Sequence, residues 1–160
     1  MENTADLQVE GNSFSCADEV AKRISRLYGD ERLADVTFVV RQGEGPERRF
    51  FGHRNIISVW SGPLERMLCG SFAEGSQREV FVKDVDPAAF DAMLKLMYCG
   101  VVDIDVDNVL AVLDVSVRFD VQPMVQFCVE FLQTNINSEH ACRMLETGVQ
   151  YSMPQIIDKC

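Results

Sequence analysis

The stretch of sequence that decides the fold comprises residues 34–74 and reads ADVTFVVRQGEGPERRFFGHRNIISVWSGPLERMLCGSFAE. It opens with an apolar residue at every second position, which is the pattern of a β-strand with one buried face. These alternating residues are Val36, Phe38 and Val40. The glycines and the proline of residues 43–46 predict a turn. Residues 49–51 are therefore predicted to return as the second strand of a hairpin.

Two short helices are predicted after the hairpin. Residues 55–60 form an apolar helical segment, and Ser61 has the side chain of a residue that caps the next helix. Pro63 suits the first turn of that second helix, because its missing N–H has no partner there in any case. The apolar face of the second helix is formed, at helical spacing, by Leu64, Met67 and Leu68.

The order of these elements resembles the BTB/POZ family. Asp35-Val36 matches the start of the family's first strand, and residues 50–54 (FFGHR) match its hairpin exit, with Gly52 where alanine is usual. Residues 56–68 match the family's pair of helices, with leucine at two positions where phenylalanine is usual. The resemblance implies an α+β fold, in which a small mixed sheet is flanked by a cluster of helices. It places the BTB/POZ domain at residues 16–135.

The remainder of that domain is predicted to be mostly helical. Asp86 and Pro87 have the residue types of a helix start, and Gly100 that of a helix end. The other predicted elements are an amphipathic helix at 16–28, strands at 79–82 and 101–106, and helices at 88–98, 108–119 (capped by Asp107) and 123–135.

The two ends of the chain differ in character. Residues 1–15 are polar and aperiodic, and we predict that they are flexible. Beyond Asn135 the sequence predicts a helix from Asn137 to Thr147, ended by Gly148, and another from Ser152. This pair resembles the opening of the BACK domain that follows BTB in kelch-type and related adaptors. Residues 136–160 are therefore assigned to a truncated BACK domain, and the chain is expected to be a fragment of a longer protein.

Charge and composition limit the classes of partner. The net charge of −10 argues against nucleic acid and against an anionic membrane surface, because both require basic patches. No apolar run is long enough to span a bilayer. The first eighteen residues lack the basic start and apolar centre of a secretory signal. We therefore expect the protein in the cytoplasm, with the nucleus as a second compartment.

Neither catalysis nor a cofactor is predicted. The six cysteines lie at least fourteen residues apart, so no zinc-binding CxxC pair exists, and reduced thiols without a disulfide are expected. The alternative is a redox-sensing thiol, with Cys69 and Cys99 as the more exposed candidates. Of the two histidines, His53 lies at the junction between the hairpin and a helix, where a structural hydrogen bond is predicted. No nucleophile and base are paired, so the chain is not expected to be an enzyme.

The resemblance implies a protein-interaction module that forms a homodimer. In the BTB family the first helix packs across a twofold axis, and a buried Asp and Arg lie near that axis in some members. The candidate dimer residues are Val20, Ile24, Leu27, Asp35 and Arg54. The alternative for the first helix is that it packs only on the core of its own chain.

The resemblance further implies recruitment of the cullin-3 N-terminal domain by a substrate adaptor of a ubiquitin ligase. Members that bind the cullin carry a hydrophobic-x-Glu motif, which Phe72-Ala73-Glu74 fits. The substrate would be held by a downstream domain. The alternatives are a Phe72 that folds back onto the core, a transcriptional regulator that binds corepressors, and an oligomerisation scaffold. The candidate cullin-binding residues are Met67, Leu68, Phe72, Glu74 and Tyr98.

Overall fold

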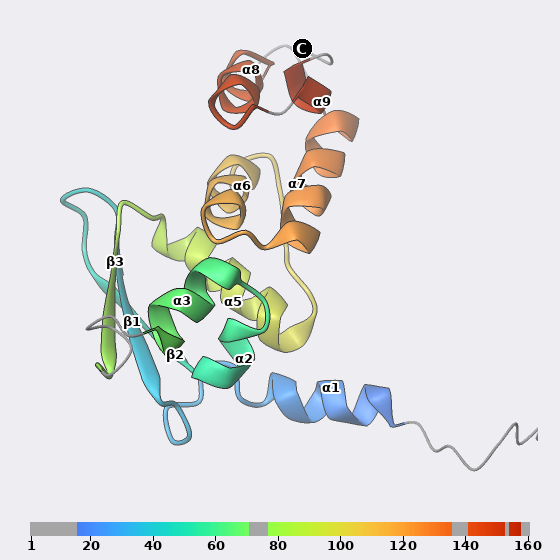
Figure 1. Ribbon diagram of the computed structural model, residues 1–160. Coiled ribbons are helices and arrows are strands. Elements are labelled where there is room, and N and C mark those ends of the chain that lie inside the picture. The colour runs from blue at the N-terminus through green and yellow to red at the C-terminus, as the bar shows by residue number, and fades with distance from the viewer. Residues whose placement is uncertain (1–15, 71–76, 136–140, 153, 158–160) are drawn as a thin grey trace, which may run out of the picture.

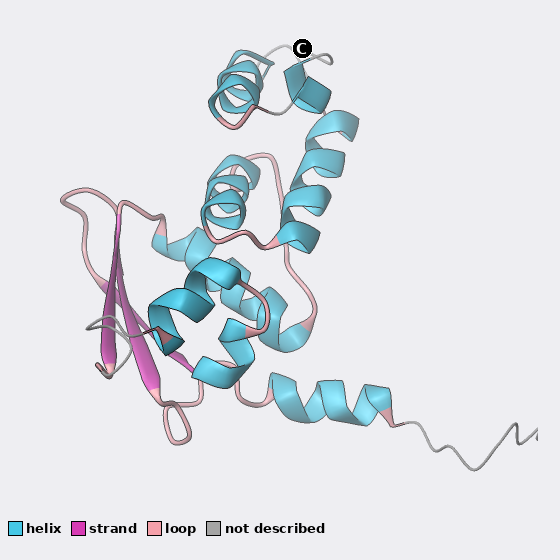
Figure 2. Ribbon diagram, in the orientation of Figure 1, coloured by secondary structure: helices cyan, strands magenta, loops and turns pink. Residues whose placement is uncertain are grey.

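The computed structural model of this chain describes residues 16–70, 77–135, 141–152 and 154–157. The sheet lies along one margin of the molecule and helices cover one of its faces (Figures 1 and 2). No described helix is long and apolar enough to cross a membrane. The elements are, in order, α1 (Ala17–Ser25), β1 (Val36–Arg41), β2 (Arg48–Gly52), α2 (Arg54–Ser58), α3 (Gly62–Cys69), β3 (Glu79–Lys83), α5 (Pro87–Cys99), α6 (Val109–Arg118), α7 (Gln122–Thr134), α8 (Ala141–Gln150) and α9 (Pro154–Ile157).

The predicted small mixed sheet is confirmed. Its strand order is β2-β1-β3, with β1 antiparallel to β2 and parallel to β3. Phe38 at the centre of β1 is opposite Phe50 on one side and Val80 on the other. The predicted alternation buries Val36, Phe38 and Val40 completely, so the inner face of β1 forms the floor of the core.

Four phenylalanine rings connect the sheet to the helices that cover it. The ring of Phe90, on α5, has its centroid 5.3 Å from that of Phe38 and 5.6 Å from that of Phe50. The ring of Phe119, at the end of α6, lies 5.8 Å from Phe90 on its other side. Aromatic rings at these separations attract each other in addition to removing apolar surface from water. Helix α5 is therefore the central element of the core.

The predicted helix caps are confirmed at three positions. The Ser61 hydroxyl accepts a hydrogen bond from the backbone N–H of Leu64 at 3.1 Å, and Asp86 accepts one from Ala89 at 2.8 Å. Gly100 ends α5 with a φ of 70°, a left-handed conformation that costs glycine little. Ser61 also donates to the carbonyl of Phe119 at 2.5 Å, so the start of α3 is joined to the end of α6.

Two predictions in the helical region were wrong. Residues 101–106 form no strand, and the N-cap of α6 is Asn108, without a side-chain cap hydrogen bond, in place of Asp107. The Asp105 carboxylate accepts from the backbone N–H groups of Asp107 and Asn108, at 3.0 and 2.9 Å. Such local acceptance by aspartate closes a turn and competes with strand formation.

A third prediction was wrong at the C-terminal end of the chain. Gly148 lies inside α8, which continues to Gln150. The left-handed residue that follows this helix is Ser152, with a φ of 53°. The predicted start of that helix, at residues 137–140, lies outside the described residues.

Candidate interaction site

Arg54, the first residue of α2, ties together the two ends of the segment that contains Phe72 and Glu74. Its guanidinium donates to the carbonyl of Leu68 in the last turn of α3 and to the carbonyl of Gln77 just before β3. These two acceptors flank residues 71–76, which the structure does not describe. Arg54 therefore sets the spacing of the two stems from which the predicted Phe-x-Glu motif extends.

The Asp35 side chain is hydrogen-bonded to the backbone of Arg54. Its carboxylate Oδ1 accepts a hydrogen bond from the backbone N–H of Arg54 at 2.8 Å, at the exposed N-terminus of α2. A carboxylate at this end satisfies an N–H that the helix itself cannot pair, and it interacts favourably with the helix dipole. The two predicted residues are thus brought together, but in a single chain Asp35 is exposed and Arg54 is only half-buried. The burial of this pair near a twofold axis, which the resemblance implied for a dimer, stays a prediction.

Two of the predicted cullin-binding residues lie in the core, so that part of the prediction was wrong. Leu68 is 1% exposed and Tyr98 is 3% exposed, which leaves neither side chain able to contact a partner. Leu68 packs inward from α3, and Met67 beside it is half-buried against the core. The exposed side of α3 instead presents Glu65, Arg66 and Cys69, which sequence reasoning did not include.

Tyr98 forms part of a buried polar pair. Its hydroxyl accepts from the backbone N–H of His53 at 2.8 Å and lies 2.9 Å from the Nδ1 atom of the His53 ring. Burial raises the pKa of Tyr98 to about 12. The predicted structural role of His53 is therefore confirmed, and the pair joins the end of α5 to the junction of β2 and α2.

Helix α1 is attached to the body at one end only. Ile24 and Leu27 pack against the core, and the Tyr28 hydroxyl donates to Asp91 Oδ1 on α5 at 2.5 Å. Val20 is 52% exposed, and the first part of α1 projects away from the other helices (Figure 1). Packing on its own core therefore accounts for Ile24 and Leu27, whereas Val20 belongs to an apolar surface with no described neighbour.

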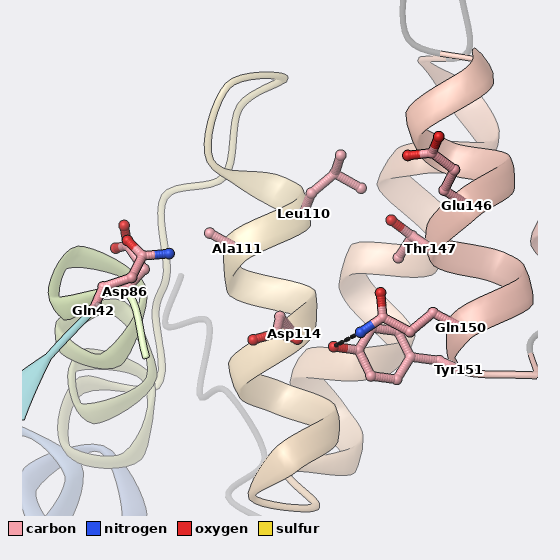
Figure 3. Close-up of a pocket in the computed structure, with 9 residues that line it drawn as sticks. All are labelled: Gln42, Asp86, Leu110, Ala111, Asp114, Glu146, Thr147, Gln150 and Tyr151. Carbon is pink, nitrogen blue, oxygen red and sulfur yellow. Dashed lines mark hydrogen bonds between the residues drawn. The ribbon is translucent and has the colours of Figure 1, made fainter. Parts of the chain in front are cut away.

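A cleft of about 320 Å³ lies between α6 and α8. Leu110 on α6 points toward α8, whereas Ala111 points toward Asp86, which also lines the cleft (Figure 3). Asp114 on α6 and Glu146 on α8 add two carboxylates to the lining. At its end Gln150 Nε2 donates to the Tyr151 hydroxyl at 3.2 Å. No basic side chain is among the described residues that line the cleft. Its described lining is therefore apolar at Leu110 and Ala111 and acidic at Asp114 and Glu146.

The described part of the chain brings no metal-binding set together. No three His, Cys, Asp or Glu side chains within it lie close enough to hold an ion. The five described cysteines are free thiols, with Cys69 exposed and Cys99 half-buried. Burial raises the pKa of the Cys128 thiol to about 12, so this sulfur stays protonated at neutral pH.

The comparisons with known proteins agree with this architecture. Human BTB/POZ domain-containing protein 3 is 33% identical over 141 residues, which is 88% of this chain. Human BTB/POZ domain-containing protein 6 is 32% identical over 91% of the chain, and the zebrafish (Danio rerio) protein 6-B is 32% identical over 87%. The chain spans about a quarter of the length of these relatives, 27% to 28%. The profile of the BTB/POZ domain matches residues 25–136. The chain therefore belongs to the BTB/POZ domain family.

Proposed function

We propose that this protein-interaction module homodimerises and recruits the cullin-3 N-terminal domain as the substrate adaptor of a ubiquitin ligase. The observation that carries the cullin proposal is the position of Arg54, which bridges Leu68 and Gln77 on either side of the Phe-x-Glu motif. A motif on a loop with fixed stems gives a partner a defined place to bind, because less conformational entropy is lost on association.

Phe72 is the proposed anchor and Glu74 the proposed orienting charge. A large apolar side chain that enters a partner's pocket supplies most of the binding free energy at such sites. A charge at the rim acts mainly on orientation and on the association rate. Leu68 and Tyr98 support this surface from inside the core and make no contact with the partner.

The cleft between α6 and α8 is proposed as a second contact, separate from the Phe-x-Glu motif, because its lining includes Gln42 and Asp86, which follow the ends of β1 and β3. We propose that residues 136–160 begin a BACK domain, whose first described helix, α8, forms one wall of this cleft. An extended segment of the cullin that carries basic residues would place them near Asp114 and Glu146. The location that goes with this function is the cytoplasm, with the nucleus as a second compartment.

Homodimerisation is proposed through the apolar side of α1. Val20 is the test residue, because it is exposed in the single chain, whereas Ile24 and Leu27 also pack on the core. Val20→Glu is expected to lower the mass measured by light scattering at tens of micromolar from that of a dimer to that of a monomer. Loss of the dimer is the only destabilisation expected. The melting temperature of Val20→Glu should therefore stay within a few degrees of that expected for a monomeric wild-type chain. A wild-type chain that is monomeric under these conditions would reject the dimer.

Isothermal titration calorimetry against the purified cullin-3 N-terminal domain tests the adaptor function. Phe72→Ala should weaken binding by more than about 2 kcal/mol, or roughly 30-fold, and Glu74→Ala by less. Phe127→Ala is the matched control, because Phe127 is an exposed phenylalanine on α7 and is expected to have no effect. Equal binding by Phe72→Ala and wild type would move the site elsewhere. A wild-type chain that does not bind would reject the adaptor function.

A further inference from the structure

Strand β3 lies at the edge of the described sheet, with β1 on one side only. On its inner side Thr37 donates its backbone N–H to the carbonyl of Arg78 at 2.7 Å, and the parallel register continues along β1. The backbone groups of Val80 and Val82 therefore point toward β1. Since successive residues of a strand point their N–H and C=O groups to opposite sides, those of Glu79, Phe81 and Lys83 point outward. No described strand pairs with this edge.

The same three residues carry their side chains on the outer face of the sheet. Val80 and Val82 are buried on the inner face, whereas Phe81 is 58% exposed. An open strand edge with an exposed aromatic side chain is a template for pairing with another strand, and proteins usually protect such edges. The exposure of Phe81 therefore makes this edge suitable for pairing with another strand.

The sequence of β3 is complementary to itself. It reads EVFVK, with an acid at one end, a base at the other and phenylalanine at the centre. If two copies pair antiparallel about Phe81, Glu79 of each copy lies opposite Lys83 of the other. Opposite charges in directly facing positions stabilise an antiparallel pair, and two facing phenylalanines do the same. A parallel arrangement would instead place like charges side by side.

We propose that β3 is a self-association edge, which pairs antiparallel with β3 of a second copy of this chain around a twofold axis at Phe81. Glu79, Phe81 and Lys83 can form the backbone hydrogen bonds of this pairing, because each directs both its N–H and its C=O toward the second copy. The pairing joins two three-stranded sheets into one sheet of six strands. Glu79 already forms an ion pair with Arg49 across the outer face, so in the assembly it would lie between two bases.

This edge is separate from the dimer surface proposed on α1. In Figure 1 β3 forms one margin of the molecule, whereas α1 projects from the opposite side. A protein with two different twofold interfaces forms tetramers or extended chains of dimers. A five-residue strand buries little area, so we expect weak association that is visible at concentrations on the order of 100 µM.

Charge exchange provides a specific test by sedimentation velocity from low to high protein concentration. The average mass of the wild type should rise with concentration beyond that of its low-concentration species. Lys83→Glu places two acids opposite each other, and Glu79→Lys places two bases opposite each other, so each variant alone should lose this rise. An equimolar mixture of the two variants should regain it, because every facing pair is then of opposite sign. The double variant carrying both changes should regain it as well.

Two further variants keep the test independent of folding and of the α1 surface. Phe81→Pro removes an outward N–H that β1 does not use, so the sheet remains paired while the rise in mass is lost. Val20→Glu should halve the mass at low concentration and leave the concentration-dependent step in place. The proposal is overturned if wild type shows no rise, if both single variants rise as wild type does, or if their mixture fails to recover it.

Discussion

The hydroxyl of Tyr98 accepts a hydrogen bond from the backbone N–H of His53 at 2.8 Å and lies 2.9 Å from the Nδ1 atom of the same residue. The two rings also meet edge to face, with centroids 5.7 Å apart. One hydroxyl thus satisfies two polar atoms at the point where the chain leaves β2 and enters α2. The sequence predicted that Tyr98, near the end of α5, lies on a binding surface. In the structure it instead connects two elements inside the core.

Tyr98→Phe should therefore lower stability and leave partner binding unchanged. The substitution removes the acceptor of a buried N–H, and a buried donor left without a partner costs about 1–3 kcal/mol. Urea denaturation of the two proteins measures the difference in the free energy of unfolding. Phe119→Leu, a conservative change in the same core, is the control for lost packing alone. If Tyr98→Phe keeps its stability but no longer binds the partner, the Tyr98 hydroxyl acts in binding and not in the core.

Alkaline pH should destabilise the fold in a defined range. Burial raises the pKa of Tyr98 from 10.0 to about 12 and that of Cys128 from 9.0 to about 12. In both cases the folded chain keeps its proton after the unfolded chain has lost it. The contribution is therefore complete below pH 9 and is lost as the pH rises toward 12. Urea midpoints at pH 8, 10 and 11 should fall progressively, and Tyr98→Phe with Cys128→Ala should flatten that fall.

The sequence was sufficient for features that depend on near neighbours in the chain. The alternation around Phe38 and the caps at Ser61 and Asp86 are local patterns, and they led to the correct elements. The burial of Tyr98 depends on His53, 45 positions away, and no periodicity reports such a distance. The same applies to Arg54, because its two carbonyl acceptors are known only once α3 and β3 are in place.

The packing around Gly52 explains why this chain has glycine where the family pattern usually has alanine. A Cβ on Gly52 would lie 2.6 Å from Ile57 Cδ1 and 3.1 Å from Phe38 Cε2. Ile57 is fully buried, so its end has little room to move. The Cδ1 methyl group of Ile57 occupies the space that the side chain of an alanine at position 52 would need.

Gly52→Ala should therefore cost about 1–3 kcal/mol, the usual range for overpacking a core. Ile57→Val removes the clashing methyl group and should by itself cost about 1 kcal/mol. The double variant should be more stable than the sum of the two changes implies, because the residues share one space. Thermal or chemical denaturation of all four proteins completes the cycle. Additive effects would mean that the added Cβ is accommodated elsewhere.

Asp35 should contribute through its hydrogen bond to the N-terminus of α2. Asp35→Ala leaves the backbone N–H of Arg54 without its acceptor and should cost about 1 kcal/mol, as for a lost N-cap. Asp35→Asn retains an acceptor and loses only the charge, so the expected cost is smaller. Denaturation in low and high salt separates the contribution of the hydrogen bond from that of the charge, because salt screens only the charge. If Asp35→Asn is the more damaging change, the carboxylate has a charged partner in the dimer.

Arg54→Lys should weaken cullin-3 binding although residue 54 does not need to contact the partner. An ammonium group is a point donor, whereas the planar guanidinium reaches the carbonyls of Leu68 and Gln77 at once. The loop stems should then separate more easily, and the Phe-x-Glu motif must be ordered on binding. We expect an affinity loss of about tenfold with a less favourable binding entropy in calorimetry. Arg32→Lys, at an exposed position whose ion pair is with Asp30, is the matched control. Hydrogen exchange should quicken at Gln77 and Arg78 in Arg54→Lys alone, and unchanged exchange with unchanged affinity would remove Arg54 from the proposed site.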